Sequence, residues 1–223
     1  MRDVHTLEEY VRGLSPRAEF LIVVLGAFAL PALFSLVAVL NLGSAAGPVE
    51  LRNEDLEALI VQEAAVLMLL GWLLHARGWS VDNFGPYPSW RELVAAAGLW
   101  LAILVLSKLQ DSIVDLSGTP MQVRNGGFDW PVVLAISIIN PLFEELLLCA
   151  YVIPFVAQRQ GTATGIAVAL AIRLACHTYL GGAGLAWIAM VGLVLSLYYV
   201  RTRRLWPVLI AHGVLDFVGL ATA

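Results

Sequence analysis

Charged side chains are scarce in this sequence. They make up 13% of the 223 residues, whereas a typical soluble domain has about 25%. Hydrophobic residues reach 60%, and the mean hydropathy is +0.82. So few charges cannot cover the surface of a soluble domain of this length, and an integral membrane protein is predicted instead. The net charge is only −4, which gives no electrostatic basis for binding nucleic acid.

Cysteine is rare as well. Cys149 and Cys176 both lie inside apolar segments, so they are interpreted as small buried side chains and not as a disulfide framework. No internal repeat is present. The first 19 residues are polar and the apolar run that follows is long, so no cleavable signal peptide is expected.

Long apolar runs are what the sequence does contain. A bilayer core about 30 Å thick is crossed by about 20 helical residues, and in lipid such a run is stable only as a helix. We therefore predict an all-α, polytopic transmembrane helix bundle with about seven spans. The predicted spans are Phe20–Leu42, Leu56–Ala76, Leu93–Leu106, Trp130–Ala157, Thr162–Leu180, Leu185–Val200 and Leu205–Leu220.

The basic residues between these spans predict an orientation. With the N-terminus inside, nine basic residues fall on the inner side and three on the outer side, and Arg173 lies within a span. This asymmetry is the one that the positive-inside rule expects. An odd number of spans then places the C-terminus outside.

Ionisable side chains at membrane depth are costly, so each one needs an explanation. In the first half of the chain the candidates are Glu63 and His75. Glu63 lies within the second span and is interpreted as paired with a polar neighbour. His75 lies near the end of that span, where its ring reaches the interface. Both residues therefore have a structural interpretation.

The fourth span contains two adjacent carboxylates, Glu144 and Glu145, in the middle of a strongly apolar stretch. Two like charges in a medium of low dielectric constant require a cation, a metal ion or a bound proton. A purely structural role is therefore a weak explanation for this pair. We interpret it as the centre of a functional site.

Two further spans carry ionisable pairs at helical spacing. Arg173 and His177 end the fifth span, and His212 and Asp216 lie in the seventh. Residues four apart share one face of a helix. Either histidine alone would more often be a satisfied core residue. Three such groups on three spans instead predict one shared polar cavity.

The order of these groups resembles the CPBP family of intramembrane proteases, which includes the CAAX prenyl endopeptidases and the bacteriocin-processing (Abi) proteins. The family pattern is EExxxR, then FxxxH, then HxxxN or HxxxD, each on its own helix. The resemblance covers a catalytic region at 130–223 with four spans, whereas region 1–129 matches only as three generic hydrophobic spans. Two positions depart from the pattern: Cys149 replaces the motif arginine, and Arg173 replaces the motif phenylalanine. We expect Arg173 to supply the missing charge by pairing with Glu145.

The resemblance implies a glutamate-centred endopeptidase that acts on a peptide or protein with a membrane-associated segment, prenylated or not, in the cytoplasmic membrane of a prokaryote. Glu144 would activate a water that His177 also holds, and His212 would stabilise the oxyanion. Asp216 would orient His212, and Glu145 completes the candidate catalytic set. Metal-free chemistry is favoured, with zinc held by Glu144, His177 and His212 as the alternative.

Two other functions remain open. A proton-coupled transporter also uses intramembrane Glu and His residues, and a non-catalytic binding or immunity protein could retain the polar site for structure. The depth of the motif residues is a difficulty for all three functions. In straight helices Glu144 lies mid-span, His177 toward the outer end and His212 toward the inner end, so tilted or displaced helices must bring them level.

Overall fold

The computed structural model describes residues 7–42, 50–80, 89–113, 124–125 and 127–222. The helices outside the C-terminal region are α1 (Leu7–Arg12), α2 (Pro16–Leu42), α3 (Asn53–Ala76) and α4 (Trp90–Ile113). The C-terminal region contains α5 (Trp130–Glu145), the π-helix η2 (Leu146–Val152), α6 (Ile153–Gln160), α7 (Thr162–Cys176), the 3-10 turn η3 (Thr178–Leu180), α8 (Gly181–Thr202) and α9 (Trp206–Thr222). Strands β1 (Glu50–Leu51) and β2 (Arg124–Asn125) form a short parallel pair. The predicted all-α membrane bundle is confirmed.

Each predicted span corresponds to a helical segment, but several boundaries differ. Five segments are long and apolar enough to cross a membrane, and α7 and α9 are shorter apolar helices. The third and sixth predicted spans are too short, because α4 has 24 residues and α8 has 22. These helices continue past the apolar runs through polar end residues, since a helix keeps its hydrogen bonds in the interface as well as in lipid.

The fifth predicted span, Thr162–Leu180, is too long. Helix α7 ends at Cys176, and the backbone of His177 leaves the helical region with φ −118° and ψ 11°. Turn η3 follows, and α8 begins at Gly181, whose φ of +68° is accessible mainly to glycine. The chain therefore reverses direction close to His177, so this histidine stays near the interior of the bundle.

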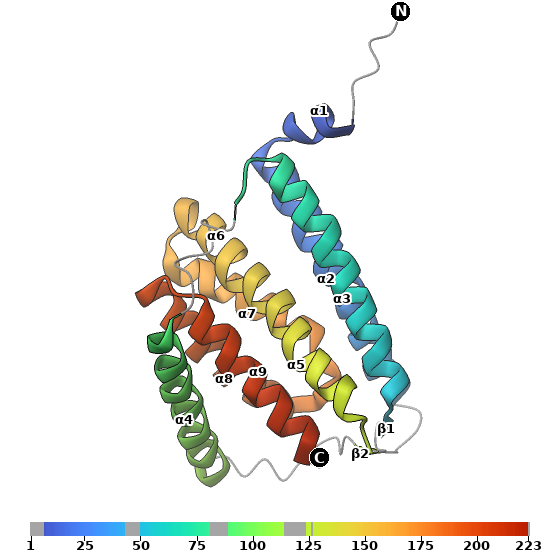
Figure 1. Ribbon diagram of the computed structural model, residues 1–223, viewed down its shortest axis with the longest axis vertical. Helices are drawn as coiled ribbons and strands as arrows, with labels where there is room; N and C mark the ends of the chain where they lie inside the picture. The colour runs from blue at the N-terminus through green and yellow to red at the C-terminus, as the bar shows by residue number, and fades with distance from the viewer. Residues whose placement is uncertain (1–6, 43–49, 81–88, 114–123, 126, 223) are drawn as a thin grey trace, which may run out of the picture.

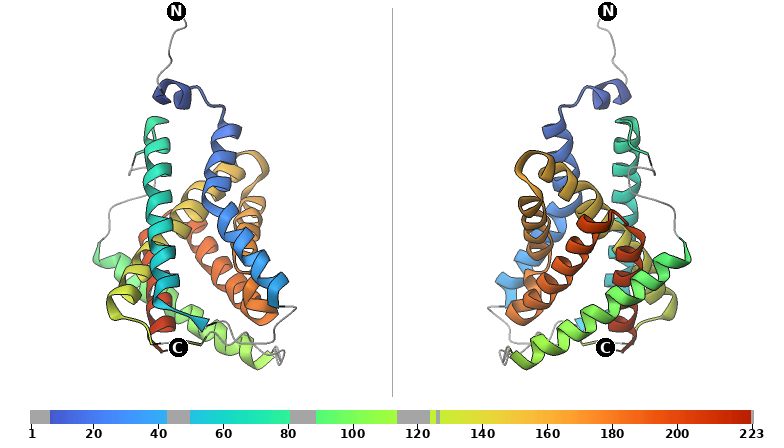
Figure 2. Two further views of the ribbon diagram at one scale, coloured as in Figure 1. Left: turned by 90° about the vertical axis from the view of Figure 1, so that its right-hand side faces the viewer. Right: turned by 90° about the vertical axis from the view of Figure 1, so that its left-hand side faces the viewer.

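The segment from Trp130 to Gln160 is the central element of the fold. In this segment α5, η2 and α6 follow one another without a break. Of the residues in its apolar 18-residue stretch 61% are buried, against 22% in each of the other four long segments. Helix α5 packs against α3 and α9, and α7 packs against α2, α6 and α8. Helix α4 lies at the edge opposite α2 and α3 (Figure 1) and crosses the bundle obliquely (Figure 2). The carboxylate pair Glu144 and Glu145 thus lies on the best-covered of the five long segments.

Large apolar side chains on the outer helices are exposed, as expected for surfaces that face lipid. Examples are Leu25 on α2, Met68 on α3 and Val105 on α4. Helix α1 and the C-terminal end of α9 lie at opposite ends of the long axis (Figure 1). This arrangement agrees with an odd number of crossings, and the inside–outside orientation stays a prediction.

Candidate active site

The site begins where α5 changes into a π-helix. Glu144 and Glu145 are the last two residues of α5, and η2 starts at Leu146. Pro154 follows the π-helix and has no backbone N–H, so it cannot maintain the regular α-helical hydrogen bonds at this point. π-helical turns within α-helices are frequent at functional sites. Both glutamates are buried, Glu145 completely.

Arg173 of α7 bridges the two carboxylates. Its Nη1 donates to Glu144 Oε2 at 2.7 Å, and its Nη2 donates to Glu145 Oε1 at 2.6 Å. The guanidinium group is buried, so these charge-assisted bonds lie in a region of low dielectric constant. The predicted contact between Arg173 and Glu145 is confirmed, and the same group also binds Glu144.

A glycine on α8 makes room for this arginine. A Cβ atom at position 192 would lie 2.9 Å from Arg173 Cδ and 3.1 Å from its Nε. Small residues let membrane helices approach closely. Gly192 therefore lets α8 pack against α7 without displacing the guanidinium group from the two carboxylates.

Cys149 occupies the position of the motif arginine and still contacts the second glutamate. Its Sγ donates to Glu145 Oε2 at 3.2 Å. The thiol is completely buried and carries no positive charge. Position 149 therefore keeps a hydrogen bond to Glu145, while the cation now comes from α7.

His177 contacts the first glutamate from the end of α7. Its Nδ1 lies 2.8 Å from the carbonyl oxygen of Arg173. A carbonyl only accepts, so Nδ1 is assigned as the protonated nitrogen. Nε2 lies 3.8 Å from Glu144 Oε1. A neutral His177 thus directs an acceptor nitrogen toward the carboxylate.

His212 of α9 lies between two carboxylates. Its Nδ1 lies 2.7 Å from Glu145 Oε1, and its Nε2 lies 3.5 Å from Asp216 Oδ1. Because a carboxylate accepts, Nδ1 is the donor to Glu145. The contact with Asp216 is too long for a strong hydrogen bond. Nε2 is therefore the ring nitrogen that is available to a ligand.

Through these contacts the predicted site residues lie at a common depth in the helix bundle. Side chains from α5, α7 and α9 meet around the two glutamates, and Glu145 receives Arg173, Cys149 and His212 together. With three donors already bound, Glu145 is suited to orient its neighbours. Among the described residues, Glu144 Oε1 has one charged or polar neighbour, His177 Nε2 at 3.8 Å. Of the four carboxylate oxygens it is thus the one most open to a further partner.

Glu63 has the polar partner that the sequence predicted. Asn140 of α5 donates from its Nδ2 to Glu63 Oε1 at 2.8 Å. Asn140 lies one helical turn before Glu144 on α5, which places Glu63 at the edge of the same site. Sequence reasoning missed Asn140, although its position four residues before Glu144 was a signal for a shared helix face.

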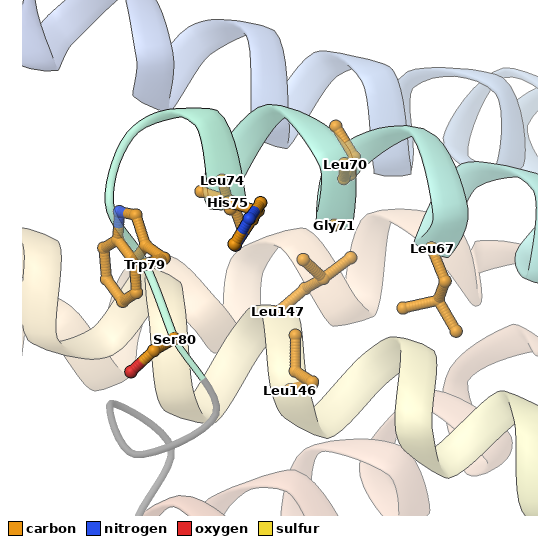
Figure 3. A pocket seen from close by; sticks show the side chains of 9 residues that line it. All are labelled: Leu67, Leu70, Gly71, Leu74, His75, Trp79, Ser80, Leu146 and Leu147. Atoms are coloured by element: carbon orange, nitrogen blue, oxygen red, sulfur yellow. The ribbon is translucent and has the colours of Figure 1, made fainter. Parts of the chain in front are cut away.

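His75 lies outside this site. It contributes to an apolar cavity of about 240 Å³ between the end of α3 and η2. Figure 3 shows its ring near Leu74 and Trp79, with Leu146 and Leu147 approaching from the other helix. The ring is exposed, in agreement with the interfacial interpretation of this residue.

The donor set does not fit a zinc ion well. Among the described residues, the ligand atoms that gather within 4.8 Å belong to Glu144, Glu145 and His212, so Glu145 replaces His177 in the set expected from the sequence. The Arg173 guanidinium already bonds both carboxylates, and a divalent cation would have to displace it. This competition favours the metal-free alternative, which stays a prediction.

Residues 126–218 match the family model described as "Type II CAAX prenyl endopeptidase Rce1-like". The matched segment contains every motif residue from Glu144 to Asp216. This part of the chain is thus similar to the CAAX-protease (CPBP) family. No curated protein and no solved structure matches the chain.

The close contact between α5 and α9 depends on Gly213, which lies inside the matched segment. A Cβ atom there would lie 2.5 Å from the carbonyl oxygen of Ser137. Gly213→Ala must therefore push α9, which carries His212, away from α5. We expect its free energy of unfolding to fall by about 1–3 kcal/mol, as for other overpacked sites, measured by denaturant titration in micelles.

Gly219→Ala is the matched control, because a Cβ at that position on the same helix meets nothing within 4 Å. This variant should unfold as the wild type does. Equal stability of the two variants would contradict the close packing of α5 against α9.

Proposed function

We propose that the protein is an intramembrane endopeptidase in which Glu144 activates a water molecule and His212 stabilises the oxyanion. The observation that carries the proposal is the meeting of side chains from α5, α7 and α9 around one carboxylate pair. A CAAX-type protease region in a membrane-embedded chain implies a membrane-associated substrate.

The geometry of Glu144 and His177 suits a shared water molecule. Glu144 Oε1 and His177 Nε2 are 3.8 Å apart, and both can accept a hydrogen bond. A water about 2.8 Å from each atom would donate one proton to each. As this water attacks the scissile carbonyl carbon, Glu144 takes up its proton, as a general base does. Arg173 holds the other oxygen of Glu144, so Oε1 keeps its orientation.

His212 can bind the negative charge that forms on the carbonyl oxygen. Its Nδ1 donates to Glu145 at 2.7 Å, so the proton on Nε2 of a doubly protonated ring would be the one that is donated to the oxyanion. An N–H directed at the developing oxyanion contributes more in the transition state than in the ground state. When the tetrahedral intermediate collapses, the C–N bond breaks and Glu144 returns the proton to the leaving amine.

Two rival functions fit the described residues less well. A proton-coupled transporter should spread unpaired ionisable groups along a path. Outside the site, the buried groups pair locally: Glu19 with Arg77 and Tyr151, and Glu92 with Arg204. A non-catalytic binding protein is favoured only by the Arg173–Glu144 bond, and that bond leaves Glu144 Oε1 available.

The decisive experiment offers the purified protein, in lipid nanodiscs, a fluorescent peptide that ends in a farnesylated CAAX sequence and the same peptide without the farnesyl group. Mass spectrometry then locates any cut. Cleavage of either peptide at a single bond supports the proposal and identifies the substrate class. The same assay is repeated with a library of peptides derived from membrane segments. If none of these peptides gives more product than in empty nanodiscs, the result counts against an endopeptidase.

Removing metal ions tests whether Arg173 takes the place of a metal ion at the two carboxylates. We expect exhaustive chelation to leave the cleavage rate unchanged and to leave no stoichiometric zinc by elemental analysis, because the guanidinium already bonds both carboxylates. Loss of activity that zinc alone restores would instead support a metal site at Glu144 and His212. A known zinc protease treated in parallel controls for incomplete chelation.

A further inference from the structure

A polar pair at the edge of the site is not used by the proposed chemistry. Glu63 of α3 is 3% exposed and accepts one hydrogen bond, from Asn140 of α5. Its second oxygen, Oε2, is buried and has no partner among the described residues. Buried polar atoms without partners are rare and costly. This atom therefore suggests a ligand group that supplies the missing donor.

The pair lies next to the reactive carboxylate. Asn140 precedes Glu144 by four residues on α5, so the two share one helix face. Glu63 is joined to this face by its hydrogen bond to Asn140. A ligand held at the pair would thus extend over the reacting centre.

The hydrogen-bonding capacity of the pair matches a peptide main chain. Glu63 uses one N–H of the Asn140 amide, which leaves the second N–H as a donor and Oδ1 as an acceptor. Glu63 Oε2 adds another acceptor. An extended peptide alternates N–H and C=O groups and can satisfy both kinds. An anionic headgroup would be repelled by the surrounding carboxylates.

We infer that Asn140 binds the main chain of the substrate beside the bond to be cut, with Glu63 as the residue that positions the Asn140 amide. This inference rests on the proposed endopeptidase function. It adds a subsite on α3 and α5 that lies outside the three sequence motifs.

The main test variant is Asn140→Leu combined with Glu63→Leu. Replacing both partners avoids a buried unpaired carboxylate, so this double variant should fold. We expect KM to rise about tenfold for loss of a substrate hydrogen bond, with kcat nearly unchanged. Glu63→Gln keeps an acceptor for Asn140 but replaces the second acceptor, Oε2, by a donor, so KM should rise by about threefold, less than in the double variant.

Glu92→Gln is the matched control. Glu92 is a buried carboxylate of α4 that pairs with Arg204 at 2.8 Å. This variant should keep the wild-type KM. Thermal melting of all variants in nanodiscs separates a loss of binding from a loss of folding.

Binding is measured with the same two peptides, farnesylated and unmodified, on proteins that also carry Glu144→Gln to prevent cleavage. In the double variant the affinity for both peptides should fall by the same factor, because the two peptides have the same main chain. A loss confined to the farnesylated peptide, or a wild-type KM in a folded double variant, would overturn the inference alone. A wild-type protein that neither binds nor cuts either peptide would overturn the proposed function and this inference together.

Discussion

Purified Glu144→Gln protein is expected to fold as the wild type does and to lose at least about a hundredfold of its cleavage rate, the lower end of what a general base contributes. Glutamine keeps the size of the side chain but cannot take up the proton of the attacking water. Folding should survive because Arg173 still pairs with Glu145, at 2.6 Å. The variant also removes one negative charge from a buried site.

The measurement compares single-turnover cleavage and thermal melting of three proteins: wild type, Glu144→Gln and Glu92→Gln. Glu92 is as deeply buried as Glu144 but lies on α4. If the carboxylate acts as a base, only Glu144→Gln loses activity while its melting temperature is kept. A Glu144→Gln protein that cleaves at the wild-type rate would show that another group activates the water.

The helices and the members of the site could be predicted from the sequence. Long apolar runs have one stable form in lipid, so the runs located every spanning segment. Glu144, His177 and His212 stood out because ionisable groups in such runs are costly. The same cost predicted that Arg173 and Glu145 would pair, and their atoms lie 2.6 Å apart.

The common depth of these residues could not be predicted. The sequence-based estimate assumed straight helices of similar length, which separated His177 from His212 across the bilayer. In the structure, α7 has 15 residues and ends at Cys176. His177 therefore lies inside the bundle. Glycine contacts, such as Gly213 against Ser137, then fix how closely α9 approaches α5. Such contacts depend on which helices pack together, and the sequence of one span does not show which other spans pack against it.

The change of α5 into a π-helix was equally hidden. The fourth predicted span runs without interruption through Pro154, and a proline alone does not distinguish a kink, a break and a π-helical turn. The partner of Glu63 was also missed, because Asn140 lies on another span. Helix periodicity identifies residues that share a face, whereas contacts between faces depend on the packing of α3 against α5.

Arg173→Leu should have the largest effect on folding. The arginine pairs with both buried carboxylates, at 2.7 and 2.6 Å. Without it, two like charges stay together with only the histidines to balance them. Removing one partner of a buried ion pair costs about 3–5 kcal/mol. We expect a loss of this size in denaturant titration, and a loss of cleavage in any folded fraction.

The family pattern suggests how to reverse this loss. Cys149 Sγ lies 3.2 Å from Glu145 Oε2. The side chain introduced by Cys149→Arg would therefore lie next to the same carboxylate. It would need the volume that the Arg173 guanidinium now fills. Arg173→Phe vacates that volume and restores the family residue. The double variant Cys149→Arg with Arg173→Phe should therefore recover much of the stability and activity.

A double-mutant cycle separates this exchange from unrelated gains. Arg173→Phe alone leaves the carboxylates without their cation, and Cys149→Arg alone places a second guanidinium beside the first. Both single variants should be less stable than the double variant, which gives a favourable coupling energy of about 1–3 kcal/mol for residues in contact. A double variant no more stable than Arg173→Leu would mean that the cation must come from α7. Arg173 would then be a fixed part of this site and not a relocated motif arginine.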